Sequence, residues 1–585
     1  MYGLNKLYLL MEKQHNRGQD GAGIAAVKLN TEPGYPFLHR IRSIETMAIA
    51  DLFRQISEEI AELEKYQPDI KKHPGLMKGN IRFMGELLLG HLRYGTQGRN
   101  NVEFCHPFIK CHTIPALNLA LAGNFNLINT EELFSLVNIE PGVFQKQSDL
   151  AAMMEVVHHF LVKEDELHPE RLDIVNVLKK STRLFDGGYH VGGLIGNGDS
   201  FVMRDAHGIR PSYYYINDDI IVAASERAAI RTTFNVSEKE VHELMPGHAL
   251  IVRADGSYEI TQILEPQERK ACSFERIYFS RGNDEKIYKE RNALGNHLSD
   301  PVLKAIDYDL KNTVFSFIPN TAEVAFYGLL KGMEDYLNKI KVQRITSWGK
   351  DYDEEKLVEM VNRRIRVEKI ANKDVKMRTF ITEDVSRNEL VQHVYDITYG
   401  SIRKGEDTVV VIDDSIVRGT TLRESIIRMI SRLEPKRIII VSSAPQIRYP
   451  DCYGIDMSKM RDFIAFQAAI ELLKERKMDH LLQELYNKCR ELERNNQLHS
   501  ENVVRQVYKP FTAEEISQKI ARLITPPDVT IPIDIIYQTI EDLHASCPTN
   551  TGDWYFTGNY PTPGGNRVVN KAFINYMEGK NIRGY

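Results

Sequence analysis

The 585-residue sequence is poor in cysteine and tryptophan, with six and two residues. So few cysteines over this length exclude a disulfide-stabilised scaffold and favour a reducing compartment, so we expect a cytoplasmic protein. No apolar run reaches the ~18 residues of a membrane-spanning helix, and no basic and apolar leader starts the sequence. A net charge of −5 leaves no basic excess for nucleic acid. We therefore expect a globular protein of several domains that binds neither membranes nor nucleic acid.

The most informative motif lies in the carboxyl-terminal half. Four apolar residues, Val409 to Ile412, precede Asp413, Asp414 and a loop of Ser, Arg, Gly and Thr. Such an apolar run suits a strand buried on both faces of a parallel sheet. Open α/β sheets bind ligands at the carboxyl ends of their strands, and the start of the next helix favours a phosphate. Carboxylates beside a phosphate make sense if they face hydroxyls or Mg²⁺. The plainer alternative is a strand, turn and helix with two solvated acids.

This run closely resembles the phosphoribosyl-pyrophosphate (PRPP) motif of type I phosphoribosyltransferases. The resemblance implies that the paired acids hold the ribose hydroxyls and that the loop holds the 5′-phosphate. The implied PRPP-binding residues are Asp413, Asp414, Ser415, Arg418, Gly419, Thr420 and Thr421. The implied magnesium ligands are Thr321, Asp413 and Asp414. Arg378 resembles a catalytic-loop arginine that contacts the diphosphate, and Lys373 or Lys376 could assist it.

The order of predicted helices and strands changes near residue 266. Helical spacing predicts a first helix over residues 1–14. Residues 80–265 resemble strands with Gly and Asn turns around a more helical segment, 151–186, which predicts a layered α+β domain.

Beyond this change, short apolar runs at 314–318, 409–412 and 438–441 predict strands. Helical spacing over 421–433 lies between the last two, which indicates a parallel βαβ crossover. Residues 455–505 are expected to be helical, and residues 557–565 to form turns.

Several short motifs in the amino-terminal half are each weak alone. They lie at residues 14–24, 91–98, 123–126, 148–149, 204–211 and 224–226. Their order and spacing together resemble the class II glutamine amidotransferases, whose glutaminases are amino-terminal-nucleophile (Ntn) hydrolases. With both halves present, the sequence resembles the amidophosphoribosyltransferase family along nearly its whole length.

The resemblance implies a fold and a reaction. Residues 1–265 would form an Ntn hydrolase-like four-layer αββα glutaminase domain lacking its first strand, and 266–510 an α/β type I phosphoribosyltransferase domain with a parallel sheet. Residues 511–585 would be an extension packed on that domain. The implied reaction transfers glutamine-derived ammonia to C1 of PRPP, giving 5-phosphoribosylamine, pyrophosphate and glutamate at the start of purine synthesis. Purine nucleotides as feedback inhibitors and a homodimer or homotetramer are also implied.

Three residues match the family's glutamine site. Arg93 and Asp149 would hold the carboxylate and the ammonium of glutamine, which need partners of opposite charge. Asn124 would donate to the oxyanion of the tetrahedral intermediate. Phe125 stands where the family has Gly, which puts the oxyanion geometry in doubt.

The family's nucleophile is a Cys at the mature amino terminus. This sequence begins with Met1, and its first Cys is Cys105, which we interpret as structural. Matching Arg17 to the family places Met1 inside the first helix. Either the sequence is truncated or glutaminase chemistry has been lost, and the retained clamp residues favour truncation. As written, the chain is expected to depend on ammonia.

Other interpretations remain open. One is a catalytically impaired PRPP- or nucleotide-binding regulator, and another is a nucleobase phosphoribosyltransferase. Some family members also carry a four-Cys iron–sulfur cluster. Cys272 and Cys452 lie near two ligand positions, but Cys547 has no Cys-x-x-Cys partner, so no cluster is expected.

Overall fold

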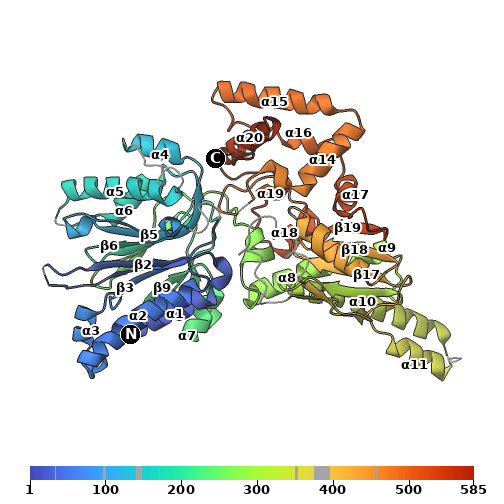
Figure 1. Ribbon diagram of the computed structural model, residues 1–585, viewed down its shortest axis with the longest axis horizontal. Coiled ribbons are helices and arrows are strands. Elements are labelled where there is room, and N and C mark those ends of the chain that lie inside the picture. Colours follow the sequence, from blue (N-terminus) through green and yellow to red (C-terminus); the bar gives the residue numbers. More distant parts are fainter. Residues whose placement is uncertain are drawn as a thin grey trace.

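The computed structural model describes residues 1–32, 34–95, 101–139, 148–169, 171–349, 353–373, 395–455 and 457–584. The predictions for Lys376 and Arg378 lie outside these residues, as does the side chain of Lys373. In Figure 1 the amino-terminal half, coloured blue to green, lies beside the carboxyl-terminal half, coloured yellow-green to red.

Two stacked antiparallel sheets form the centre of the amino-terminal half. Their strand orders are β2-β1-β3 and β12-β11-β7-β6-β5-β4. The strands are β1 (Ala22–Val27), β2 (Leu38–Ser43), β3 (Leu87–Leu92), β4 (Phe108–Lys110), β5 (Leu119–Leu127), β6 (Gly187–Ile195), β7 (Ser200–Arg204), β11 (His248–Val252) and β12 (Tyr258–Gln262). Ala25 and Val27 of the first sheet pack against Ala120 and Leu194 of the second. This contact buries the facing surfaces of both sheets.

Helices cover the outer faces of both sheets (Figure 1). They are α1 (Tyr2–Lys13), α2 (Ala48–Tyr66), α3 (Pro74–Asn80), α4 (Thr130–Leu136), α5 (Asp149–Leu167) and α6 (Ile174–Thr182). Helix α7 (Arg227–Phe234) packs instead on Tyr215 and Val222, outside these two sheets. Met11 of α1 and Leu52 of α2 pack on β1, whereas Met153 of α5 and Val177 of α6 pack on the six-stranded sheet. A third sheet, of order β10-β8-β9, contains β8 (Tyr213–Ile216), β9 (Ile221–Ala224) and β10 (His242–Glu243).

The carboxyl-terminal half is built on a parallel five-stranded sheet of order β14-β13-β17-β18-β19. The strands are β13 (Thr313–Phe317), β14 (Arg366–Val367), β17 (Thr408–Asp413), β18 (Arg437–Ser442) and β19 (Ile533–Tyr537). Val409 and Val411 enter one core while Val410 and Ile412 enter the other, because strand side chains alternate. The predicted parallel sheet with strands buried on both faces is confirmed.

Two predictions of local structure need correction. Residues expected to form a helix after Thr421 begin with a π-helical turn, Leu422–Ile426, before α13 (Ile427–Ser431). The turn expected over 557–565 contains the start of α20 (Pro563–Met577). A Pro fits there because the first helical N–H has no partner within the helix.

One strand was missed altogether. β19 lies within 511–585 and supplies the fifth strand of the sheet. The domain limits themselves stay a prediction.

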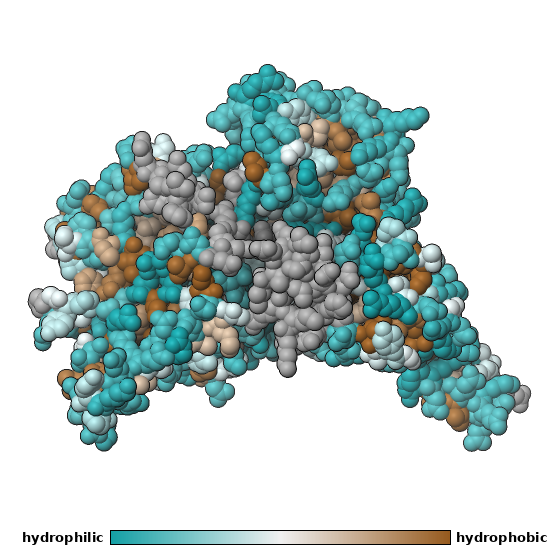
Figure 2. Space-filling view, viewed as in Figure 1, coloured by the Kyte–Doolittle hydropathy of each residue, from teal (hydrophilic) through white to brown (hydrophobic). Residues whose placement is uncertain are grey.

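The other helices of this half surround the sheet. They are α8 (Glu285–His297), α9 (Ser299–Ala305), α10 (Glu323–Trp348), α11 (Glu354–Asn362), α14 (Ile464–Glu475), α15 (Asp479–Arg494), α16 (Arg505–Tyr508), α17 (Ala513–Ile524), α18 (Ile540–Ser546) and α19 (Trp554–Thr557). Helix α11 and the end of α10 project from the body in Figure 1, and Figure 2 shows their surface as mainly hydrophilic. Among the described residues, we find no helical segment with the length and hydrophobicity that a bilayer crossing requires.

A buried network of ion pairs connects the two halves. Arg17 Nε lies 2.8 Å from Glu226 Oε1, and its Nη1 lies 2.7 Å from Glu275 Oε2. Glu275 also pairs with Arg210 at 3.2 Å, and Arg210 Nε donates to the Tyr453 carbonyl at 2.7 Å. Burial alone would raise the pKa of Glu275, but the two guanidinium groups lower it below its usual value. The two arginines therefore keep the buried Glu275 carboxylate in its charged form, which burial alone would make unfavourable.

Candidate active sites

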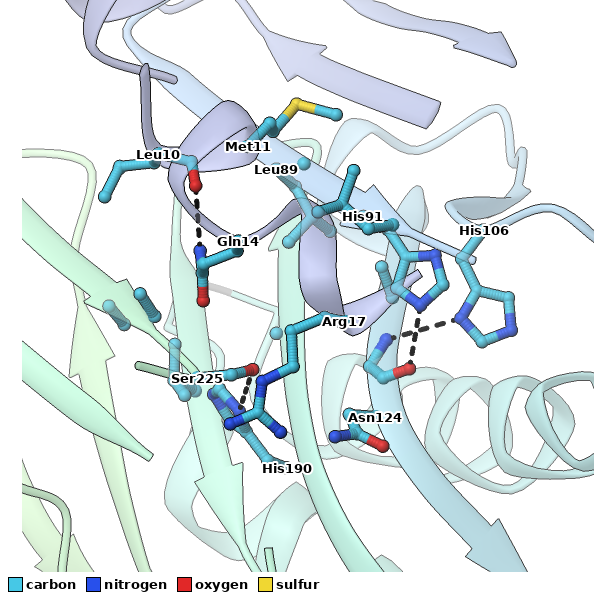
Figure 3. A pocket seen from close by; sticks show the side chains of 18 of the residues that line it. Leu10, Met11, Gln14, Arg17, Leu89, His91, His106, Asn124, His190 and Ser225 are labelled. Atoms are coloured by element: carbon cyan, nitrogen blue, oxygen red, sulfur yellow. Dashed lines mark hydrogen bonds between the residues drawn. The ribbon is translucent and has the colours of Figure 1, made fainter. Parts of the chain in front are cut away.

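A cavity of about 400 Å³ lies among elements of the amino-terminal half. It gathers the three residues expected to bind glutamine, Arg93, Asn124 and Asp149. Its other polar lining includes Gln14, Arg17, His91, His106, His190 and Ser225, and its apolar lining includes Leu7, Leu10, Met11, Leu89, Val202 and Val222. Figure 3 shows ten of these side chains around one opening.

Arg93 follows directly after β3 and is 4% exposed. Its Nη1 donates to the Asn101 carbonyl at 3.1 Å, and its guanidinium lies 5.9 Å from the centre of the Phe104 ring. A Cβ on Gly18 would lie 2.3 Å from the Arg93 carbonyl carbon, so only glycine allows the two segments this close. Gly18 of one motif thereby positions Arg93 of another.

Asp149 occupies the first position of α5, where Ser148 caps the helix by accepting from the Ala151 N–H. Asp149 Oδ2 accepts from the Leu127 N–H at 2.9 Å, which ties the helix start to the end of β5. Burial raises the pKa of Asp149 to about 6, although the Leu127 N–H and the charge of Arg583 act in the opposite direction. Its carboxylate is therefore ionised above pH 6.

Asn124 lies in the middle of β5, where it pairs in register with His190 of β6. On the neighbouring residue, the Gly123 carbonyl lies 3.1 Å from His91 Nε2, and the Gly123 N–H donates to His106 Nδ1 at 3.5 Å. His106 also stacks on Phe125, with ring centres 5.9 Å apart. These contacts fix the strand around Asn124, and the side chain of Phe125 packs on His106.

The three histidines of this cavity are neutral at pH 7. Burial lowers the pKa of His91 to about 4 and that of His190 to about 3, and it lowers the pKa of His106 well below its usual value. The charge of the cavity therefore comes from Lys6, Glu86, Asp149 and the arginines of its lining. Burial also raises the pKa of the Cys105 thiol, which lies 4.0 Å from Arg93 Nη1. A thiol that keeps its proton is a poor nucleophile.

Two strand edges line the same cavity although they belong to different sheets. The Arg93 N–H donates to the Gly21 carbonyl, just before β1. Backbone groups along a strand point alternately to its two neighbours, so the N–H and C=O groups of Leu88, Gly90 and Leu92 point away from β1. On β9, the Asn217 N–H donates to the Ile220 carbonyl. By the same alternation, the N–H and C=O groups of Ile221 and Ala223 point away from β8.

Within the described ranges, these outward groups make no backbone hydrogen bond to another segment. Both strands run toward the same end of the cavity, because Gly18 packs on Arg93 after β3 while Arg17 pairs with Glu226 after β9. The cavity is thus a slot between two parallel free edges, and Arg17 and Arg93 lie at the end toward which both strands run.

The second candidate site lies at the carboxyl end of β17. The Asp414 N–H donates to Asp413 Oδ1 at 2.9 Å, and the Ser415 hydroxyl donates to Asp414 Oδ1 at 2.9 Å. Burial and the adjacent Asp414 charge raise the pKa of Asp413 well above its usual value, and burial raises that of Asp414 to about 6. Hydrogen bonding from Ser415 and Thr321 and the charge of Arg291 counteract part of the rise at Asp414.

The loop after these acids presents its polar residues to solvent. Arg418, Thr420 and Thr421 are exposed, and Arg418 Nη2 lies 2.8 Å from Asp462 Oδ2. Gly419 has φ = 71°, and a Cβ there would lie 2.8 Å from Ile524 Cγ2. A larger residue would be strained in this left-handed conformation and would collide with Ile524. The loop shape therefore depends on Gly419.

The three predicted magnesium ligands are brought together. Thr321 follows β13, the neighbour of β17, and its side chain lies near enough to Asp414 to lower the pKa of that acid. A divalent cation would relieve the repulsion that raises the pKa values of the two acids, so these residues fit Mg²⁺. No group of three or more His, Cys, Asp or Glu side chains suited to a metal occurs among the described residues. Mg²⁺ here would need further oxygens from substrate or water.

Cys272 and Cys452 lie in packed protein. Cys272 Sγ is 3.3 Å from the Tyr555 hydroxyl, and burial raises the pKa of this thiol to about 12. Trp554 and Tyr453 pack edge to face nearby, with ring centres 4.9 Å apart. Aromatic side chains thus fill the surroundings of these thiols, and the absence of an iron–sulfur cluster stays a prediction.

Several residues of these sites have positions that the sequence motifs do not predict. His91 and Arg17 stand inside the quoted motifs, so the signal was present, but their roles as packing and bridging groups depend on contacts between the halves. Arg291 and Arg583 belong to no recognised motif, and only the fold brings them near Asp414 and Asp149.

Known proteins support the resemblance. No family model matches the chain. It is 28% identical over 474 residues to the amidophosphoribosyltransferase of Archaeoglobus fulgidus, covering 79% of this chain and 84% of that protein. It is 26% identical over 485 residues to that of Escherichia coli, covering 80% and 82%.

Two solved structures share the fold with a TM-score of 0.63. One is the glutamine PRPP amidotransferase of Bacillus subtilis complexed with ADP and GMP, at 21% identity and covering 95% of this chain and 94% of that one. The other is an allosteric regulatory enzyme of purine biosynthesis, at 22% identity and covering 95% and 93%. The family expected from the motifs is confirmed, and this chain is a homologue of the amidophosphoribosyltransferases.

Proposed function

We propose that the protein is an amidophosphoribosyltransferase that adds ammonia to C1 of PRPP and releases pyrophosphate, the first step of purine synthesis. The observation that carries this proposal is the presence, in one chain, of the acid pair at the end of β17 and of a separate cavity holding Arg93, Asn124 and Asp149. A nucleobase phosphoribosyltransferase has no use for the second site.

At the first site, Asp413 and Asp414 would bind the ribose hydroxyls, directly or through Mg²⁺. Ser415 and the residues from Arg418 to Thr421 would bind the 5′-phosphate, because their hydroxyls and backbone N–H groups precede a helical segment. Bound Mg²⁺, held by Asp413, Asp414 and Thr321, would neutralise the departing diphosphate. Arg378 is proposed to contact that diphosphate as well.

At the second site, Arg93 would bind the glutamine carboxylate and Asp149 its ammonium group, while the Asn124 amide would donate to the oxyanion. We propose that the amino-terminal half is an Ntn hydrolase-like αββα glutaminase domain. Its helices flanking two stacked sheets support this assignment.

The slot between β3 and β9 suits the nucleophile that such a domain needs. A strand added antiparallel to both free edges would begin beside Arg93 and Asn124. Its first residue could therefore attack the amide of a glutamine held there.

Pyrophosphate release from PRPP tests the function directly. With Mg²⁺ and an ammonium salt, we expect release that EDTA abolishes. Release with a purine base instead of ammonium would support a nucleobase phosphoribosyltransferase. PRPP binding without any turnover would support the regulator.

Two further properties stay proposals. The B. subtilis relative was solved with ADP and GMP, which supports purine nucleotides as feedback ligands of this chain. A homodimer or homotetramer and a cytoplasmic location are expected from the family and from the composition.

A further inference from the structure

The carboxyl-terminal tail folds back onto α20. Asn575 Nδ2 donates to the Arg583 carbonyl at 2.9 Å. A Cβ on Gly584 would lie 2.4 Å from the Val568 carbonyl oxygen, so the tail backbone lies directly against the helix. This packing carries Arg583 into the lining of the cavity that also contains Ser148 and Asp149.

The cavity is therefore completed by the other half of the molecule. Gly454 and Ile455 line it together with Arg583, although all its other lining residues precede residue 235. The positive charge of Arg583 acts on Asp149 and lowers its pKa against the effect of burial. The tail thus brings a cation to the carboxylate at the start of α5.

Three further cations line the cavity. Arg17 pairs with Glu226 and Glu275, Arg93 donates to the Asn101 carbonyl, and Lys6 donates to the Thr233 carbonyl at 2.7 Å. The cavity histidines are neutral at pH 7, for the reasons given above. Among the side chains of this lining, Arg583 is the one whose charge lowers the pKa of Asp149.

We propose that Arg583 sets the affinity of the glutamine cavity, because it neutralises Asp149 until the ammonium group of an amino acid takes its place. The inference rests on the proposed function of Asp149. A carboxylate that already faces a cation gains less from a second one, so Arg583 weakens binding of any amino acid. It also prevents a buried, uncompensated charge when the cavity holds no amino acid.

The test is a calorimetric titration of the whole chain with glutamine at pH 8. Arg583→Gln removes the charge and should tighten binding by up to about fivefold, the range expected for one partly exposed ion pair. Arg583→Lys keeps the charge and should bind like the unsubstituted chain. Lys580→Gln is the matched control, because Lys580 lies in the same tail but pairs with Glu578.

A second readout separates this role from a structural one. Glutamine binding needs ionised Asp149, so affinity should fall as the pH drops through about 6. The midpoint should move upward in Arg583→Gln, because the group that lowers the Asp149 pKa is gone. In an Asp149→Asn background, Arg583→Gln should have no effect on affinity.

The outcomes distinguish the two proposals. Equal or weaker glutamine binding in Arg583→Gln, or an effect that persists beside Asp149→Asn, overturns the role of Arg583 alone. Absence of glutamine binding in every variant overturns the proposed glutamine site, and the role of Arg583 with it.

Discussion

The two candidate sites are assembled in different ways. The acids at the end of β17 and the loop after them are consecutive in the sequence, and one strand and its neighbours position them. The glutamine cavity draws on α1, β3, β5, α5, β9 and the carboxyl-terminal tail. A contiguous site depends on local backbone geometry, whereas a dispersed site depends on everything that holds distant segments together. Substitutions at the contiguous site should therefore mainly reduce turnover, whereas substitutions around the dispersed site should also reduce stability.

The largest effect is expected at the contiguous site. Asp413→Asn keeps the shape of the side chain but removes one charge from the acid pair. If Asp413 binds ribose hydroxyls or Mg²⁺, ammonium-dependent pyrophosphate release should fall by about 100- to 1,000-fold, as expected when a group of the reacting centre is lost. Initial rates with saturating Mg²⁺ measure this directly.

Asp528→Asn is the matched control for this substitution. Asp528 pairs with Arg428 at the surface of the same half and should leave turnover within twofold of the unsubstituted chain. Full activity in Asp413→Asn would remove Asp413 from the proposed mechanism.

The next effect concerns the dispersed site. Glu275→Gln would leave the guanidinium groups of Arg17 and Arg210 buried without their shared carboxylate. Removing one partner of a buried ion pair costs about 3–5 kcal/mol, so the free energy of unfolding measured in urea should fall by that order. Arg17 and Arg210 connect to Glu226 and Tyr453, so glutamine binding should weaken as well.

Glu285→Gln provides the comparison for Glu275→Gln. Glu285 pairs with Lys289 one helical turn away at the surface, and its loss should cost less than about 0.5 kcal/mol. Similar losses in the two variants would show that the buried network adds no stability.

The same difference explains which features of the fold and of the sites can be predicted from sequence: those that depend on consecutive residues. The β17 strand, the loop with Gly419 and the parallel neighbours β13 and β18 follow from apolar runs and turn residues. The clamp residues Arg93, Asn124 and Asp149 were found through motifs, and the fold does gather them in one cavity.

Other features could not be predicted because no local pattern specifies them. β19 lies far from β18 in sequence and pairs only through tertiary packing. The π-helical start after Thr421 follows the same apolar spacing as an α-helix. Arg583 reaches the cavity only because the tail packs on α20.

A smaller effect is expected from the clamp itself. Asp149→Asn should raise the glutamine Kd about tenfold at pH 8, since a charge-assisted hydrogen bond to the ammonium is lost. Isothermal titration measures the change. PRPP turnover with ammonium should stay the same, because the two sites share no residue. A parallel loss of PRPP turnover would mean that Asp149 supports the fold instead of the ligand.

The smallest effect is a pH dependence at the acid pair. Mg²⁺ needs ionised carboxylates, and the pKa of Asp414 is about 6. A raised carboxylate pKa means that protons compete with the metal as the pH falls through that value. The Mg²⁺ concentration that half-saturates PRPP turnover should rise about twofold from pH 8 to pH 6 and should keep rising toward pH 5. Ser415→Ala removes a hydrogen bond that lowers this pKa, so its midpoint should move above 6. A half-saturating concentration unchanged between pH 8 and pH 5 would place Mg²⁺ away from Asp414, and would leave the ribose hydroxyls as the ligands of the acid pair.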